Sequence, residues 1–251
     1  MAEAVAQPDA TVQPLNEVQR IVDTFGTPSR LAKDIVRSAA WWGPFIVLIL
    51  VSTAFSFTVG KKVGWTAVYD NAINQNPKMK QMIENLPAEQ QAIARQKGIA
   101  RQPYTAYAAP VFSLAFTAIF ALLIWPTINF GFGGTAKYSR IFAVLMYSNL
   151  IGYGVKFLLA IIAIFAGLSP ESFNFNNPVG TNIGYYLVGN SPLWLVTMGA
   201  FIDLFGIWSL VVCSIGCGVV ARVKTSSAAI AVFGWFVLFM LGITGLVAAF
   251  S

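Results

Sequence analysis

Residues 193–220, LWLVTMGAFIDLFGIWSLVVCSIGCGVV, decide the fold class of this chain. The stretch is longer than the roughly 20 apolar residues that an α-helix needs to cross the hydrocarbon core of a bilayer. Asp203 is its single charged residue. A charge at the centre of a spanning helix costs about 2.5–3.5 kcal/mol on insertion scales, so it is usually retained for a function or a partner. The stretch therefore predicts a spanning helix whose carboxylate needs a counter-charge.

Four more apolar runs, at about 41–59, 106–128, 141–166 and 228–250, have the same character. Of the 251 residues, 57% are hydrophobic and 10% are charged, and the mean hydropathy is +0.67. A soluble domain carries about 25% charged residues, so this excess of apolar side chains requires a bilayer. We expect an all-α integral membrane protein whose membrane domain, 41–251, has five transmembrane helices.

Lys156, in the third span, is the only other charge inside the apolar runs. At ~1.5 Å per residue it lies ~16 Å below the outer end of its span, and Asp203 lies ~15 Å below the outer end of the next. Because neighbouring spans are antiparallel, the two side chains can form an intramembrane ion pair. Two interpretations stay open: a structural pair that fixes the register of two helices, or a pair that lines a polar cavity and transports a solute or ion.

The N-terminal region has a different composition from the spans. Residues 1–14 carry few charges and few large apolar groups, which predicts a disordered tail. Residues 15–40 predict two short amphipathic helices on the cytoplasmic side. The first of these helices has one apolar stripe, formed by Leu15, Val18, Val22 and Phe25. These helices either lie in the headgroup region or pack on the ends of the bundle.

The distribution of Lys and Arg favours a cytoplasmic N-terminus and an external C-terminus. The inside segments then carry eight basic residues, and the external loop 167–192 carries none. The segment 61–106 opposes this orientation because it carries seven, of which Lys61 and Lys62 adjoin a span. Long loops translocate with less regard to charge. We expect this segment to form a helical extramembrane loop.

Small residues recur at a spacing of four on the fourth span, which lets a neighbouring helix approach closely. The predicted packing face consists of Ser209, Cys213, Gly216 and Cys217. It serves either packing within the bundle or a homo-oligomer. The residues expected to anchor the protein at the membrane interface are Trp41, Trp42 and Trp125.

The residue types exclude several classes of chemistry. The chain has no histidine, which is the commonest metal ligand and the usual general base near neutral pH. Cys213 and Cys217 alone are too few ligands for a metal site. We expect no cofactor, no metal and no catalytic residue. The net charge of +6 is spread over loops, so anionic lipid headgroups are a better counterpart than nucleic acid.

Three stretches, taken in order along roughly residues 20–250, suggest a family. Thr24-Phe25-Gly26-Thr27-Pro28-Ser29 leads to Trp41-Trp42-Gly43-Pro44, Gly133-Gly134 precedes Tyr147-Ser148, and the fourth span carries Ile202-Asp203-Leu204-Phe205-Gly206-Ile207-Trp208-Ser209-Leu210. They resemble the Yip-one (Ypt-interacting protein) domain family in its bacterial form.

The resemblance implies a five-pass helical protein with a cytoplasmic N-terminus and an external C-terminus. Eukaryotic members act in vesicle trafficking and bind Rab-type GTPases. This chain lacks their Asp-Leu-Tyr-Gly-Pro motif before the first span. The resemblance therefore does not extend Rab binding to it, and it supplies no catalytic residues.

We therefore expect a non-enzymatic, multi-pass protein of the bacterial cytoplasmic (inner) membrane, the plasma membrane of such a cell. Besides the lipid bilayer, its partners would be proteins that it scaffolds or adapts through the N-terminal region. The alternative function is transport of a small solute or ion by Lys156 and Asp203. A membrane-embedded hydrolase is disfavoured, because the spans hold neither a carboxylate pair nor a nucleophile–base pair.

Overall fold

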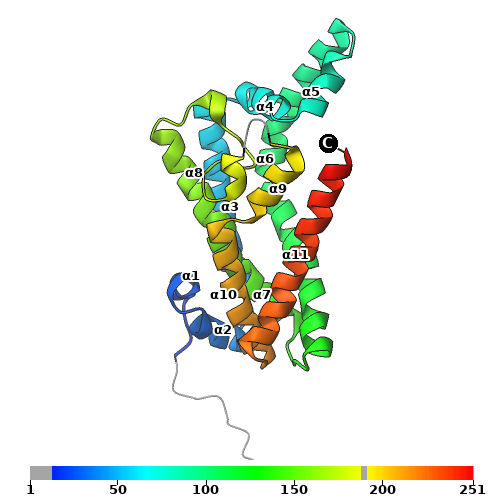
Figure 1. Ribbon diagram of the computed structural model, residues 1–251. Coiled ribbons are helices and arrows are strands. Elements are labelled where there is room, and N and C mark those ends of the chain that lie inside the picture. Colours follow the sequence, from blue (N-terminus) through cyan, green and yellow to red (C-terminus); the bar gives the residue numbers. More distant parts are fainter. Residues whose placement is uncertain (1–12, 188–190, 251) are drawn as a thin grey trace, which may run out of the picture.

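The computed structural model describes residues 13–187 and 191–250, and their regular secondary structure is helical (Figure 1). Five helical stretches are long and apolar enough to cross a membrane, which confirms the expected all-α, five-span class. They are Trp42–Val63, Ala88–Gly131, Tyr138–Phe165, Leu204–Ala221 and Thr225–Phe250. The predicted disordered tail, 1–14, falls almost entirely outside the described residues.

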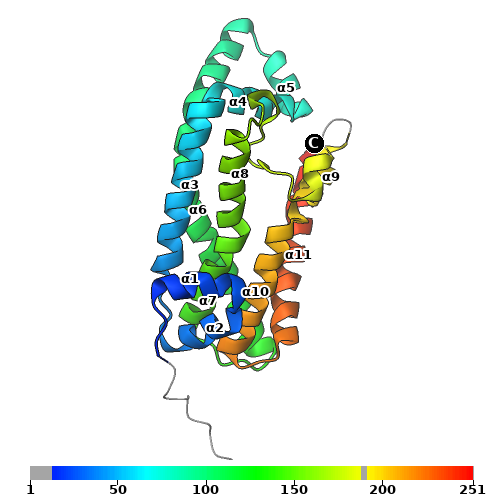
Figure 2. The same ribbon diagram turned by 90° about the vertical axis from the view of Figure 1, so that its left-hand side faces the viewer.

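The helices form an elongated bundle, with α1 (Glu17–Gly26) at one end and the last turns of α11 (Thr225–Phe250) at the other (Figure 1). Helices α1 and α2 (Pro28–Arg37) lie across one end, as Figure 2 shows from the side. Helices α4 (Trp65–Asn74) and α5 (Pro77–Glu84) form a cap at the other. We refer to these as the α2 end and the α4 end.

The first two spans extend beyond their apolar runs. Helix α3 (Trp42–Thr58) continues into the π-helical segment η1 (Val59–Val63). Helix α6 (Ala88–Pro126) runs without interruption from the cap through the apolar run and into the π-helical segment η2 (Thr127–Gly131). The predicted start of the second span, at 106, is where the helix becomes apolar and not where the helix begins.

The third span contains a π-helical insertion. It consists of α7 (Tyr138–Asn149), η3 (Leu150–Gly154) and α8 (Val155–Phe165). Such insertions inside α-helices frequently occur at functional sites. Segment η3 ends two residues before Lys156. The π-helical insertion and Lys156 therefore lie in the same part of the third span.

The fourth span departs from the continuous helix predicted over 193–220. It is divided into α9 (Leu193–Phe201) and α10 (Leu204–Ala221). Asp203 is the N-cap of α10, with an extended backbone (φ −112°, ψ 134°) and its side chain bonded to the N–H of Gly206. Aspartate is among the preferred N-cap residues because its carboxylate satisfies an N–H that the first helical turn leaves unpaired. The carboxylate expected inside a helix therefore starts one.

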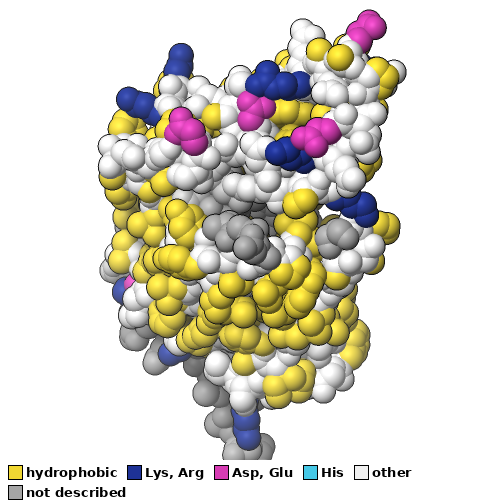
Figure 3. Space-filling model, turned by 45° about the horizontal axis from the view of Figure 1, so that its top comes forward, with side chains coloured by type: hydrophobic (Ala, Val, Ile, Leu, Met, Phe, Trp, Pro, Cys, Tyr) yellow, Lys and Arg dark blue, Asp and Glu magenta, His cyan; other side chains and the backbone are white. Residues whose placement is uncertain are grey.

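The hydrophobic core lies toward the α2 end. It forms where α7, buried from Ile141 to Ser148, contacts α2, α6 and α10. A second, smaller cluster lies toward the α4 end around Phe55 and Phe173. Figure 3 shows the charged side chains of the α4 end gathered above a broad hydrophobic surface. This distribution is the one that a bilayer around the middle of the bundle requires.

Candidate functional site: an intramembrane cavity and a terminal helix pair

The two charges of the apolar runs lie together. The Nζ atom of Lys156, on α8, is 3.3 Å from Oδ2 of Asp203 at the start of α10. The carboxylate is almost fully buried, with 4% of the side chain exposed, whereas the lysine side chain is 22% exposed. The lysine is thus the member of the pair that remains accessible.

The Asp203 carboxylate is already committed to the fold. Its Oδ1 accepts the N–H of Gly206 at 2.8 Å, and its Oδ2 accepts the hydroxyl of Thr181 at 2.5 Å as well as contacting Lys156. The N–H of Leu204 also donates to the carbonyl of Thr181 at 3.0 Å. The loop before α9 thus folds back onto the break, and Asp203 holds it there.

The ion pair lies in the wall of a cavity of about 280 Å³. Residues from α6, the third span, α9, α10 and α11 line this cavity, which is partly open to the surroundings. Its polar lining groups besides the pair are Thr117, Ser148, Asn149, Tyr153 and Ser209. Its aromatic lining groups other than Tyr153 are Phe116, Phe120, Phe201, Phe236 and Phe239. The cavity therefore combines an apolar volume with one polar, charged side.

A second, more polar hollow of about 670 Å³ lies on the α4 side of this cavity. Its lining includes the amides of Gln102, Asn174 and Asn177. The two hollows share Ala200, on α9. Helix α9 therefore stands between a polar hollow and the cavity that holds the ion pair.

The predicted packing face of the fourth span faces the inside of the bundle. A Cβ atom on Gly216 would lie 2.6 Å from Val144 on α7, so only glycine allows this approach. The hydroxyl of Ser209 donates to the carbonyl of Ser148 at 2.8 Å. Cys213 and Cys217 are buried with their Sγ atoms 3.8 Å apart. These contacts place the face between α10 and α7.

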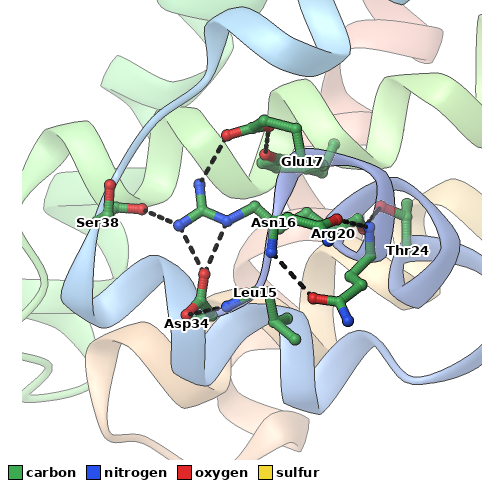
Figure 4. A network of polar contacts seen from close by, with 9 residues as sticks. Leu15, Asn16, Glu17, Arg20, Thr24, Asp34 and Ser38 are labelled. Atoms are coloured by element: carbon green, nitrogen blue, oxygen red, sulfur yellow. Dashed lines mark hydrogen bonds and ion pairs between the residues drawn. The ribbon is translucent and has the colours of Figure 1, made fainter. Parts of the chain in front are cut away.

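A second polar site lies at the α2 end, where α1 and α2 are joined by buried charges (Figure 4). Arg20 donates to Asp34 through Nε at 2.7 Å and contacts it through Nη2 at 2.6 Å. The same guanidinium donates to the carbonyl of Ser38 at 3.1 Å and lies 3.5 Å from Glu17. Both Arg20 and Asp34 are buried.

This network also ties the helix pair to the bundle. The hydroxyl of Tyr147, on α7, donates to Glu17 at 2.9 Å, and Arg140 donates to the carbonyl of Val36 at 2.7 Å. Burial lowers the pKa of Arg20, but its hydrogen bonds to Tyr147 and Asp34 outweigh burial and raise that pKa above its ordinary value. The guanidinium is therefore charged at any physiological pH.

Sequence reasoning missed the network, because Arg20 and Asp34 occur among other charges in a segment predicted to form amphipathic surface helices. Leu15 is buried, whereas Val18, Val22 and Phe25 are exposed, at 70%, 62% and 43%. The predicted stripe therefore faces outward, and the charged side of α1 faces the bundle.

The three predicted interfacial tryptophans differ in their surroundings. Trp42 is half exposed, as an interfacial anchor would be. Trp41 packs edge-on against Phe142 at 5.3 Å between ring centroids. Trp125 donates to the carbonyl of Ala136 at 2.8 Å. Trp41 and Trp125 thus stabilise the fold of the α2 end, and their role as interfacial anchors stays a prediction.

The fold and the composition define a multi-pass helical membrane protein. The sequence profile of the Yip1 domain family matches residues 22–246, nearly the whole chain, so the protein belongs to the Yip1 domain family. A search among curated proteins and a search among solved structures each found no match.

Proposed function

We propose that this Yip1 domain protein is a non-enzymatic membrane scaffold or adaptor that contacts its partners through α1 and α2. One observation carries the proposal: α1 presents Val18, Val22 and Phe25 outward, while a buried ion pair joins the helix to α2 and a hydrogen bond from Tyr147 joins it to α7. A surface that is already fixed loses little conformational freedom on binding, so it binds more tightly for the same contacts.

The same proposal includes an orientation and a location. Arg30, Lys33 and Arg37 are exposed on α2, which packs against α1. The loop 167–192 has no Lys or Arg, whereas the long segment 61–106 at the α4 end carries seven. The positive-inside rule supports a cytoplasmic α2 end and an external C-terminus. Together with the bacterial form of the family that the sequence resembles, this supports the bacterial inner membrane.

Crosslinking with mass spectrometry in native membranes tests the proposal. The triple variant Val18→Ser, Val22→Ser, Phe25→Ser should lose the protein crosslinks made near α1 by the wild type, including any made between copies of this chain. Deleting the whole region is less informative, because Leu31 and Ile35 of α2 are part of the core.

The matched control is Met79→Ser, Met82→Ser, which alters exposed apolar side chains at the α4 end. This variant should keep the crosslinks at α1. An unchanged crosslink pattern in the α1 variant would show that contact runs through another surface.

Transport of a small solute or ion remains the alternative, and the cavity around Lys156 and Asp203 favours it. The commitment of both Asp203 oxygens to the fold weighs against a carboxylate that changes partners during a transport cycle. Swelling of proteoliposomes in polar solutes measures this directly. Solute entry that Lys156→Met abolishes would favour transport over the scaffold.

A further inference from the structure

We infer that the cavity beside Lys156 binds an anionic lipid, with a negatively charged headgroup on Lys156 and an acyl chain among the phenylalanines. The inference concerns the cavity and does not depend on the proposed contacts of α1.

The walls of the cavity indicate the apolar part of the ligand. Phe116 and Phe239 lie 5.0 Å apart between ring centroids, and Phe201 contacts Phe236 and Phe239 at 6.0 and 6.1 Å. These rings come from α6, α9 and α11 and border the same cavity. A hydrated solute would lose water contacts against such walls, whereas an acyl chain gains apolar contact there.

The polar side of the cavity indicates the headgroup. An ammonium group has three N–H donors, and among the described residues Asp203 is the one group that contacts the ammonium of Lys156. Asp203 in turn has its oxygens engaged by Gly206 and Thr181. The ammonium of Lys156 is therefore the member of the pair that still has N–H donors to offer. Such donors suit a phosphate or carboxylate oxygen.

The depth of Lys156 is compatible with a lipid that enters from one leaflet. Trp41 packs on Phe142, so these residues share one level at the α2 end. Lys156 follows Phe142 by 14 positions, roughly 21 Å along the helix. Lys61 follows Trp41 by 20 positions, roughly 30 Å. Counted from Phe165, whose ring lies 5.4 Å from the Lys62 ammonium, the depth is nine positions or roughly 14 Å. Lys156 thus lies about 9–14 Å inside the α4-side boundary, a depth that a headgroup drawn inward and a long lysine side chain span together.

The experiment uses the full chain in nanodiscs made of equal parts phosphatidylcholine and phosphatidylglycerol. Native mass spectrometry after release into mild detergent counts the retained lipids of each kind. The wild type should retain phosphatidylglycerol in preference to phosphatidylcholine. Lys156→Met should reduce that preference roughly tenfold, the size expected for one charge-assisted hydrogen bond. Lys156→Arg should keep it.

Two further variants separate the site from general effects. Lys62→Met removes one exposed charge at the α4 end, where the ammonium lies 5.4 Å from the Phe165 ring, and should leave the preference unchanged. Ala200→Phe narrows the cavity without altering a charge and should lower retention of phosphatidylglycerol. An unchanged preference in both Lys156→Met and Ala200→Phe would overturn the inference.

The source of the anion is tested by thermal denaturation in detergent with added oleate or inorganic phosphate at equal concentration. Oleate should raise the melting temperature of the wild type but not of Lys156→Met, and phosphate should raise neither. Equal stabilisation by phosphate would mean that the cavity takes a water-soluble anion, which contradicts a lipid site.

Discussion

Replacing Arg20 by methionine should favour a locally unfolded state in which α1 and α2 separate from each other and from the bundle, without unfolding the spans. The substitution removes both contacts to Asp34, the bond to the carbonyl of Ser38 and the ion pair with Glu17. Asp34 then keeps the N–H of Leu15 at 3.3 Å and the more exposed guanidinium of Arg37 at 3.9 Å, and it stays buried. Removing one partner of a buried ion pair costs about 3–5 kcal/mol. The locally unfolded population of the helix pair should therefore rise by roughly 150- to 5,000-fold.

Limited trypsin digestion of the detergent-solubilised protein, followed by intact mass measurement, reports this population. The bond after Lys33 lies within α2 and is protected while α2 is helical and docked. Cleavage of transiently opened segments follows the population of the open state when opening is fast. The cleavage rate after Lys33 should rise by the factor given above, and the melting temperature of the bundle should change much less.

The matched control is Lys224→Met, an exposed lysine at the same end of the bundle. Exposed substitutions usually change stability by about 0.5 kcal/mol or less, so its cleavage rate should stay near that of the wild type. Arg20→Lys keeps the charge but loses the planar, two-pronged geometry, and should fall between the two. A cleavage rate in Arg20→Met equal to that of the control would refute the idea that this ion pair holds the helix pair in place.

Three further expectations follow from single contacts. Gly216→Ala should destabilise the bundle by about 1–3 kcal/mol, because the added Cβ would overlap Val144. Gly242→Ala places its Cβ in open space and should leave stability unchanged, and thermal melts compare the two variants. Tyr147→Phe should cost about 1 kcal/mol through the lost bond to α1, and a fall in melting temperature as large as for a core deletion would contradict this. Asp203→Asn should be milder than Asp203→Leu in the same assay, since asparagine can still cap α10.

Hydropathy identified the membrane spans well because burial in lipid depends on composition over some twenty residues. Helix boundaries follow hydrogen bonding instead, so the polar start of α6 at Ala88 and the π-helical segment η3 had no hydropathy signal. The shared depth of Lys156 and Asp203 could be predicted because the counted segments, α8 and α9, are helical and the break covers only Ile202 and Asp203.

The break at Asp203 had a local signal that the apolar context obscured. Aspartate followed by a helix-compatible run is a strong start signal, yet it stood within a long apolar stretch that suggested one continuous span. The contact with Thr181 and the bridge to Asn182 depend on how the loop returns to the bundle. Such tertiary contacts carry no periodic pattern in one sequence, and the same holds for the pairing of Arg20 with Asp34.

The divided fourth span has an electrical consequence. The polar loop that meets Asp203 and the amide-lined hollow beside α9 bring polarisable groups into the layer from the α4 end. The apolar slab beneath the break is then ~20 Å thick, against ~30 Å for an undisturbed bilayer. The same transmembrane voltage then falls across ~20 Å instead of ~30 Å, so the electric field in this layer is about 1.5 times that in an undisturbed bilayer. The lysine of the pair stands at the edge of that concentrated field, so the energy of any anion bound there varies with membrane voltage.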